Sequence, residues 1–149
     1  MPFIISWPGH IKPGTADETS TLSALDLLPS LARIAGLNLP PEYHGDGKDR
    51  SKALLGKPSA RNMDMYWEYG RNNIAFAYPR GQDKSPNLAI LSGQWKLLMN
   101  HDGSNTQLYN INKDPNESRD LTNDYPKIVS GLKDKLSKWW DALPKLVDN

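Results

Sequence analysis

The sequence lacks cysteine, an excess of either charge, and any long apolar run. With no cysteine among 149 residues, disulfide bridges, cysteine-ligated zinc and thiol nucleophiles are excluded within the chain. Its 18 Lys and Arg balance 17 Asp and Glu, so charge indicates no nucleic-acid surface. The apolar run Phe3–Trp7 is far too short for a signal peptide or a membrane span. We therefore expect neither nucleic acid nor a membrane as a partner.

Familiar catalytic motifs are also missing. No Gly-x-Ser-x-Gly elbow, phosphate-binding loop or dinucleotide fingerprint occurs in the sequence. The three histidines, His10, His44 and His101, fall in turns and share no spacing that would bring them to one metal ion. We therefore expect no catalytic residue and no metal ligand in this chain. Its 12 Pro and 11 Gly predict a loop-rich protein whose recognition residues lie on loops.

The first part of the chain predicts one buried strand and one amphipathic helix. Phe3–Trp7 is continuously apolar, like a strand buried on both faces, and it needs a sheet to join. Ser23 is a candidate N-cap with Asp26 three residues later, and Gly36 is placed to end the helix. Pro29 falls in the first turn if the helix begins near Asp26. The apolar positions at helical spacing are Leu25, Leu28, Leu31, Ala32 and Ala35.

The second part predicts an antiparallel sheet packed by a C-terminal helix, so the fold class is α+β. We expect strands at Met65–Tyr69, Leu88–Leu91, Trp95–Met99 and Gln107–Ile111, with a short strand at Ile74–Tyr78 inside a long loop. Turn-forming residues separate the last three main strands, which should form a meander of about four strands with the first. From Pro126 to Leu143, apolar residues gather on one helix face that should close over this sheet. We place the internal boundary in the linker, which gives residues 1–60 and 61–149.

One local cluster indicates ligand recognition. The segment from Trp67 to Asn72 combines an aromatic platform, a carboxylate and a guanidinium at the mouth of the long loop, which is the chemistry that binds sugars or anions. We therefore take Glu68, Tyr69, Arg71 and Asn72 as candidate substrate-binding residues. The alternative, that Trp67 is a core residue and Glu68 pairs with Arg71, stays open at this point.

The order of motifs resembles the C-terminal part of formylglycine-dependent sulfatases, arylsulfatase-like and N-acetylgalactosamine-6-sulfatase-like members of the alkaline phosphatase superfamily. Similarity to the end of the family's catalytic domain is found in three segments, Pro2 to Ile11, Ser23 to Leu31 and Ala35 to Leu37. The following linker is similar to Gly45 to Gly47, Ser51 and Leu54 to Lys57. The C-terminal subdomain is resembled by Tyr66 to Tyr69, Ser92 to Leu98, Gln107 to Ile111, Asp114 to Glu117, and Asp120 with Leu121.

The resemblance implies a function for a larger protein. Residues 1–60 would be the terminal strand, helix and linker of an α/β catalytic domain, and residues 61–149 the C-terminal subdomain. The parent would be a sulfuric ester hydrolase that uses calcium and formylglycine on a sulfated saccharide, and would be periplasmic or secreted. The Cys/Ser-x-Pro-x-Arg motif that yields formylglycine is absent here, so we expect no cofactor in this chain, which should be inactive without its upstream catalytic domain.

Three other possibilities remain open from the sequence. The chain could be a stand-alone carbohydrate-binding module that uses exposed tryptophans and tyrosines as stacking platforms. A related hydrolase of the alkaline phosphatase superfamily is a further alternative. Because Phe3–Trp7 has no partner strand in its own sequence, we also expect self-association, a homodimer formed by pairing of this edge.

Overall fold

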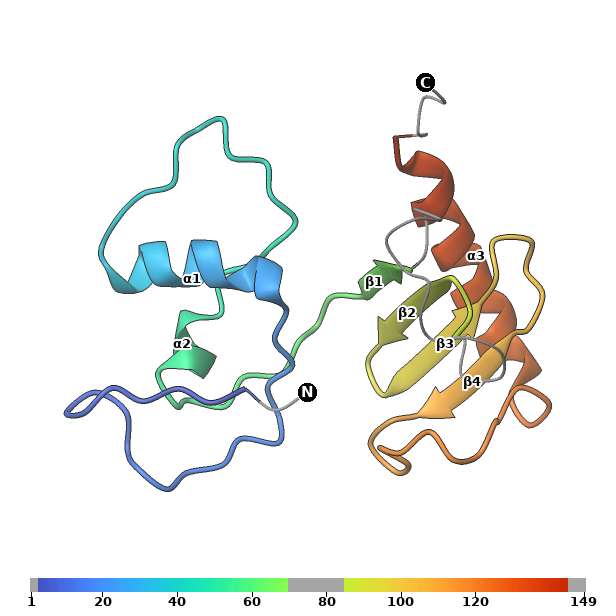
Figure 1. Ribbon diagram of the computed structural model, residues 1–149, viewed down its shortest axis with the longest axis horizontal. Helices are drawn as coiled ribbons and strands as arrows, with labels where there is room; N and C mark the ends of the chain where they lie inside the picture. The colour runs from blue at the N-terminus through green and yellow to red at the C-terminus, as the bar shows by residue number, and fades with distance from the viewer. Residues whose placement is uncertain (1–2, 70–84, 145–149) are drawn as a thin grey trace. The chain divides into compact units, whose positions relative to one another are not determined.

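The computed structural model describes residues 3–69 and 85–144. The chain divides into two compact units, Met1–Arg61 and Asn62–Asn149, which can be followed by colour in Figure 1. We call them unit 1 and unit 2, and each is described by itself. In the described ranges, no helix has both the length and the apolar character needed to cross a membrane.

Unit 1 is built around one short helix. A 3-10 turn, Ala24–Asp26, leads into α1, Leu27–Ile34, and a second short helix, α2, spans Ser51–Leu54. The predicted N-cap is confirmed, because Ser23 and Asp26 form a reciprocal capping box. The predicted end is also confirmed: Gly36 has φ +70°, and the amide of Leu37 donates to the carbonyl of Ala32 over 2.9 Å, which closes the helix. Pro29 lies in the first turn, as expected.

A buried carboxylate ties α1 to the linker that follows it. Asp26 is 1% exposed and accepts hydrogen bonds from the amides of Ser23 (2.8 Å) and Lys48 (2.9 Å). Arg61 donates to the same carboxylate, with Nη1 2.6 Å from Oδ2 and Nη2 3.3 Å from Oδ1. Three stretches of chain separated by up to 35 residues are therefore held at one side chain.

The strand predicted at Phe3–Trp7 is wrong for this chain. Residues 3–7 have no strand assignment, and the carbonyl of Trp7 instead accepts the amides of His10 and Ile11, each at 3.0 Å, in a turn. A strand satisfies its backbone groups only by pairing with another strand. The four strands of the described structure all belong to the sheet of unit 2, so this segment has no paired neighbour.

Unit 2 contains the predicted antiparallel meander. Its strands are β1 (Met65–Glu68), β2 (Leu88–Ser92), β3 (Trp95–Met99) and β4 (Gln107–Asn110), in the order β1-β2-β3-β4. Each neighbouring pair is antiparallel, and Ser92 faces Trp95 across a tight turn in which Gly93 has φ +59°. The short strand predicted at Ile74–Tyr78 lies outside the described residues.

One face of this sheet is closed by the C-terminal helix, as predicted. Helix α3 spans Pro126–Ala142, with the proline in its first turn, and it lies along the sheet in Figure 1. Leu132 and Leu136 of α3 pack into the core, and the ring of Trp139 stacks on that of Tyr66 with centroids 5.1 Å apart. The sheet residues of this core are Leu88, Ile90, Leu97, Met99 and Leu108. Side chains alternate between faces along each strand, so the intervening residues point to the opposite face.

Candidate functional site

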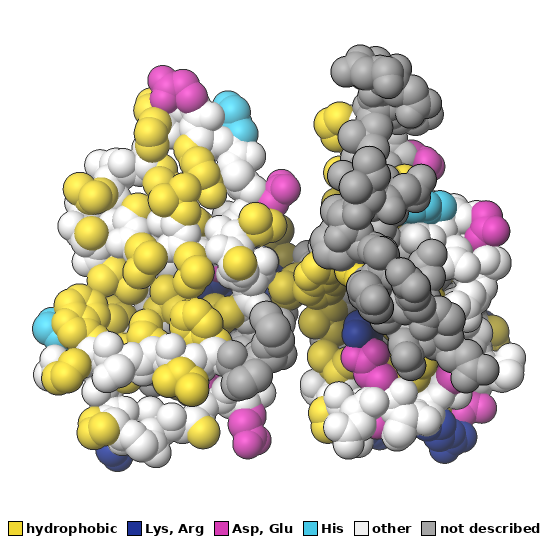
Figure 2. All heavy atoms as spheres, in the orientation of Figure 1, with side chains coloured by type: hydrophobic (Ala, Val, Ile, Leu, Met, Phe, Trp, Pro, Cys, Tyr) yellow, Lys and Arg dark blue, Asp and Glu magenta, His cyan; other side chains and the backbone are white. Residues whose placement is uncertain are grey.

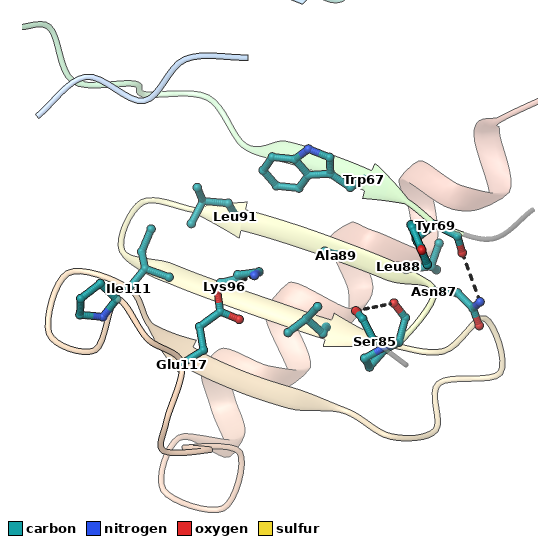
Figure 3. A pocket seen from close by; sticks show the side chains of 13 residues that line it. Trp67, Tyr69, Ser85, Asn87, Leu88, Ala89, Leu91, Lys96, Ile111 and Glu117 are labelled. Atoms are coloured by element: carbon teal, nitrogen blue, oxygen red, sulfur yellow. Dashed lines mark hydrogen bonds and ion pairs between the residues drawn. The ribbon is translucent and has the colours of Figure 1, made fainter. Parts of the chain in front are cut away.

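A pocket of about 630 Å³ lies on the sheet face opposite α3, a volume typical of small-ligand sites. Figure 3 shows side chains from β1, β2 and β3, and from the segment after β4, converging on it. The apolar part of the lining consists of Trp67, Pro86, Leu88, Ala89, Leu91, Leu98, Ile111 and Pro115, and the other lining residues are Tyr69, Ser85, Asn87, Lys96 and Glu117. The pocket is therefore mainly apolar, with a few polar groups.

The pocket wall contains one ion pair. The ammonium of Lys96 on β3 lies 2.5 Å from Oε1 of Glu117, with side chains 28% and 31% exposed. Glu117 has φ +54°, an unusual backbone conformation for a residue other than glycine, and one often kept at functional positions. Because the two charges are paired, the pocket offers adjacent hydrogen-bond donors and acceptors rather than a net charge.

Tyr109 lies on β4 directly beside Lys96, as its register partner. Burial raises the pKa of the Tyr109 phenol, and the negative charges of Asp120, Glu117 and Asp114 raise it further. Its hydroxyl donates to Oε1 of Gln107 over 3.1 Å. The phenol of Tyr109 therefore lies in a locally acidic environment beside Lys96.

The end of the pocket nearest Tyr69 is fixed by backbone pairing beyond the regular strands. The amide of Tyr69 donates to the carbonyl of Asn87 over 2.7 Å, and the side-chain amide of Asn87 donates back to the carbonyl of Tyr69 over 3.2 Å. Figure 3 shows the Asn87 contact as a dashed line. These bonds continue the β1–β2 ladder by one residue and hold Tyr69 at the pocket.

The structure does not bring all of the predicted substrate-binding residues to the pocket. Tyr69 lines the pocket, whereas Glu68 is not among the lining residues and alternates with it, on the side of Tyr66. Arg71 and Asn72 lie outside the described residues. Trp67 is 42% exposed and lines the pocket, so it is not the core residue of the alternative interpretation.

Two pocket residues were missed by sequence reasoning. The pairing of Lys96 with Glu117, 21 residues away, has no local signal. Glu117 ends an Asp-Pro-Asn-Glu segment, whose composition is typical of a turn. Nothing in the sequence indicated that it would deliver a carboxylate to the sheet.

The chemistry available in this pocket is recognition rather than catalysis. An exposed indole can stack on the apolar face of a sugar ring, and the Lys96–Glu117 pair with Asn87 can exchange hydrogen bonds with hydroxyl groups. Within residues 3–69 and 85–144, no group of three or more His, Asp or Glu could hold a metal ion. The calcium and formylglycine of sulfatases therefore do not fit the described residues, and the motif that generates formylglycine is absent from the sequence.

Comparison with known proteins identifies the family of this chain. The sequence profile of the family "N-sulphoglucosamine sulphohydrolase, C-terminal" matches residues 1–141. The chain is 27% identical over 136 residues to the N-acetylgalactosamine-6-O-sulfatase of Bacteroides thetaiotaomicron, covering 91% of this chain and 26% of that protein. It is 29% identical over 158 residues to human arylsulfatase A, covering 89% of this chain and 29% of the relative.

Solved structures show the same extent of likeness. The crystal structure of Ps i-CgsB matches with a TM-score of 0.69 and 27% identity, over 92% of this chain and 28% of that one. The same protein is also matched in complex with k-i-k-neocarrahexaose. The chain thus spans between a quarter and a third of the length of these relatives. On this evidence the chain belongs to the N-sulphoglucosamine sulphohydrolase C-terminal family, the C-terminal domain of sulfatases.

Proposed function

We propose that this chain is the non-catalytic C-terminal part of a sulfuric ester hydrolase that acts on sulfated sugars. The observation that carries the proposal is the match of residues 1–141 to a sulfatase C-terminal family, in a chain without the motif that generates formylglycine. Residues 1–60 would complete the catalytic domain, and residues 61–149 would form the C-terminal subdomain. Sulfate release would then depend on catalytic residues outside this sequence.

The contribution of unit 2 would be to hold the sugar. Trp67 offers a stacking surface, and Lys96 with Glu117 offers paired donors and acceptors, which together suit a saccharide ring better than an isolated sulfate. Arg71 and Asn72, outside the described residues, stay predictions from the sequence as further substrate-binding residues. The complex of the related Ps i-CgsB with an oligosaccharide supports a sugar as the ligand class.

The experiment replaces Trp67 with alanine in an intact sulfatase that contains this chain. We expect KM for a sulfated oligosaccharide to rise roughly 2- to 10-fold, the equivalent of about 0.5–1.5 kcal/mol of aromatic contact. KM for a small aryl sulfate should change much less, because such a substrate has no sugar ring to stack on Trp67. Steady-state kinetics on both substrates measures the difference.

Tyr125→Ala is the matched control for this experiment. Tyr125 is 43% exposed, against 42% for Trp67, but it does not line the pocket. The Tyr125→Ala substitution should leave the ratio of the two KM values unchanged. Equal effects of Trp67→Ala on both substrates would refute the proposed role of the pocket.

A stand-alone carbohydrate-binding module is the second candidate, favoured by the exposed Trp67 at a pocket of ligand size. Calorimetric titration of the 149-residue chain with sulfated and unsulfated oligosaccharides distinguishes the two functions. A module should bind sugar without any catalytic part, whereas the sulfatase assignment expects weak binding or none. Tight binding by the chain alone would favour the module.

A further inference from the structure

Helix α1 and the 3-10 turn before it expose a row of leucines to solvent. Leu25, Leu28 and Leu31 are 60%, 55% and 52% exposed, and their spacing of three residues places them on one side of the helix with Ala32 and Ala35. We call these five residues the leucine face. A helix at a protein surface normally presents its polar side to water and its apolar side to the core. Here three leucines face water instead, while the buried residues of α1 are Pro29 and Ser30.

The orientation of the helix is fixed by hydrogen bonds on its other side. Asp26 and Ser30 are 1% and 0% exposed. The hydroxyl of Ser30 donates to the carbonyl of Asp26 over 2.6 Å and accepts the amide of Arg50 over 2.7 Å. Together with the bonds from Lys48 and Arg61 to the Asp26 carboxylate, the bond from Arg50 ties this side of the helix to the linker. Rotating the helix to bury its leucines would break the bonds to Lys48, Arg50 and Arg61.

Unit 1 has little apolar core of its own to compensate. Of the twelve buried hydrophobic residues in the described structure, only Ala53 and Leu54 belong to unit 1. Its exposed large apolar side chains also include Phe3, Ile4, Ile5 and Trp7, and Figure 2 shows apolar side chains gathered over the visible face of this unit. Exposed apolar residues are ordinary when they are scattered, but gathered patches of this kind mark binding surfaces.

We propose that the leucine face, with Phe3–Ile5, is the surface through which this chain docks onto the catalytic part of a sulfatase. This inference rests on the proposed function and adds the residues that make the contact. The partner would be an apolar sheet, because helices in layered α/β domains bury one apolar side on a sheet, and because neither the leucine face nor Phe3–Ile5 carries a charge. The relatives, of which this chain covers 26–29%, have the additional length to supply that sheet.

The test compares one double variant, Leu28→Asp with Leu31→Asp, in two contexts. In the 149-residue chain these side chains already face water, so hydrogen exchange of the α1 amides should stay unchanged and binding of a hydrophobic dye should fall. In an intact sulfatase containing this chain, the same variant should lower the thermal midpoint by about 5 °C or more, because two carboxylates would enter an apolar interface. Leu54→Asp, at a position 2% exposed, is the control that should destabilise α2 and its surroundings in both contexts.

Each other result has a definite meaning. An unchanged midpoint of the intact protein would overturn the docking proposal. If, in addition, sedimentation velocity showed the variant turning a dimeric 149-residue chain into a monomer, the leucine face would be an interface between two copies. Loss of α1 protection in the isolated chain would also overturn it, because the leucines would then be part of the unit's own packing. If the substitutions lower the stability of the intact protein as expected, but the unsubstituted intact protein releases no sulfate, the proposed function is refuted. The docking surface would still stand.

Discussion

Replacing Gly47 with alanine will unfold unit 1 while the sheet of unit 2 stays folded. A Cβ atom at Gly47 would lie 1.9 Å from the carbonyl oxygen and 2.5 Å from the carbonyl carbon of Leu25. Both atoms are backbone at the start of the helical segment, and that segment is fixed by the capping box of Ser23 and Asp26. Relief therefore requires the linker to move away from α1, which would also stretch the bond from the Lys48 amide to Asp26. We expect a loss of about 3 kcal/mol or more in the stability of unit 1.

Gly45→Ala is the matched control for this prediction. A Cβ atom there also meets a close neighbour, the phenol end of Tyr43 at 2.2 Å, but that neighbour is a side chain that can rotate away. Hydrogen exchange followed by mass spectrometry reads α1 and the strands of unit 2 separately. Gly47→Ala should remove protection from α1 alone, and Gly45→Ala should largely preserve it. Equal behaviour of the two variants would contradict the close backbone approach seen in the structure.

Removing the carboxylate of Asp26 should have an effect of similar size. Asp26→Asn keeps the shape of the side chain but leaves the guanidinium of Arg61, whose side chain is 11% exposed, without its counter-charge. The Arg61 Nε is already buried without a hydrogen-bond partner among the described residues, so losing Asp26 would leave this guanidinium with still fewer bonds. Breaking a buried pair on one side costs about 3–5 kcal/mol. Asp124→Asn is the control, because its pair with Arg119 is 47% and 75% exposed and is worth at most about 1 kcal/mol.

The same pair predicts how unit 1 responds to acid. Burial acts to raise the pKa of Asp26, but hydrogen bonds from Arg61, Lys48 and Ser23 outweigh it and hold that pKa below its ordinary value. A carboxyl whose folded-state pKa is lowered stabilises the fold above its unfolded-state pKa, and this stabilisation is lost as the pH falls through the folded-state pKa. We expect unit 1 to lose stability below about pH 4. Chemical denaturation at several pH values should show a steeper loss for the natural chain than for Asp26→Asn; identical slopes would refute the role of Asp26.

Local signals predicted the elements of this fold well. The cap at Ser23, the stop at Gly36 and the proline that opens α3 each act within one helical turn, so the sequence around them carries the whole interaction. The tight turn at Gly93 likewise aligns two neighbouring strands. The meander and its covering helix follow from such signals together with the alternation of apolar residues along each strand.

The residues that define the sites depend on long-range contacts. Arg61 pairs with Asp26 across 35 residues, and Glu117 pairs with Lys96 across 21 residues. The sequence between the partners gives no signal of either pairing. Helical periodicity identified α1 as amphipathic, but it could not show that Leu28 and Leu31 would face water while Ser30 is buried. The strand predicted at Phe3–Trp7 failed for a related reason, because apolar composition indicates a need for partners and does not supply them.

The most direct test of the account is whether the 149-residue chain alone can release sulfate. The purified chain would be incubated with calcium, a small aryl sulfate and sulfated oligosaccharides, and inorganic sulfate would be measured alongside an intact sulfatase of the same family. Because the described residues contain no metal-binding cluster and the sequence has no motif for generating formylglycine, we predict release no faster than in the buffer blank. Turnover that coelutes with the chain through successive purification steps would contradict the account.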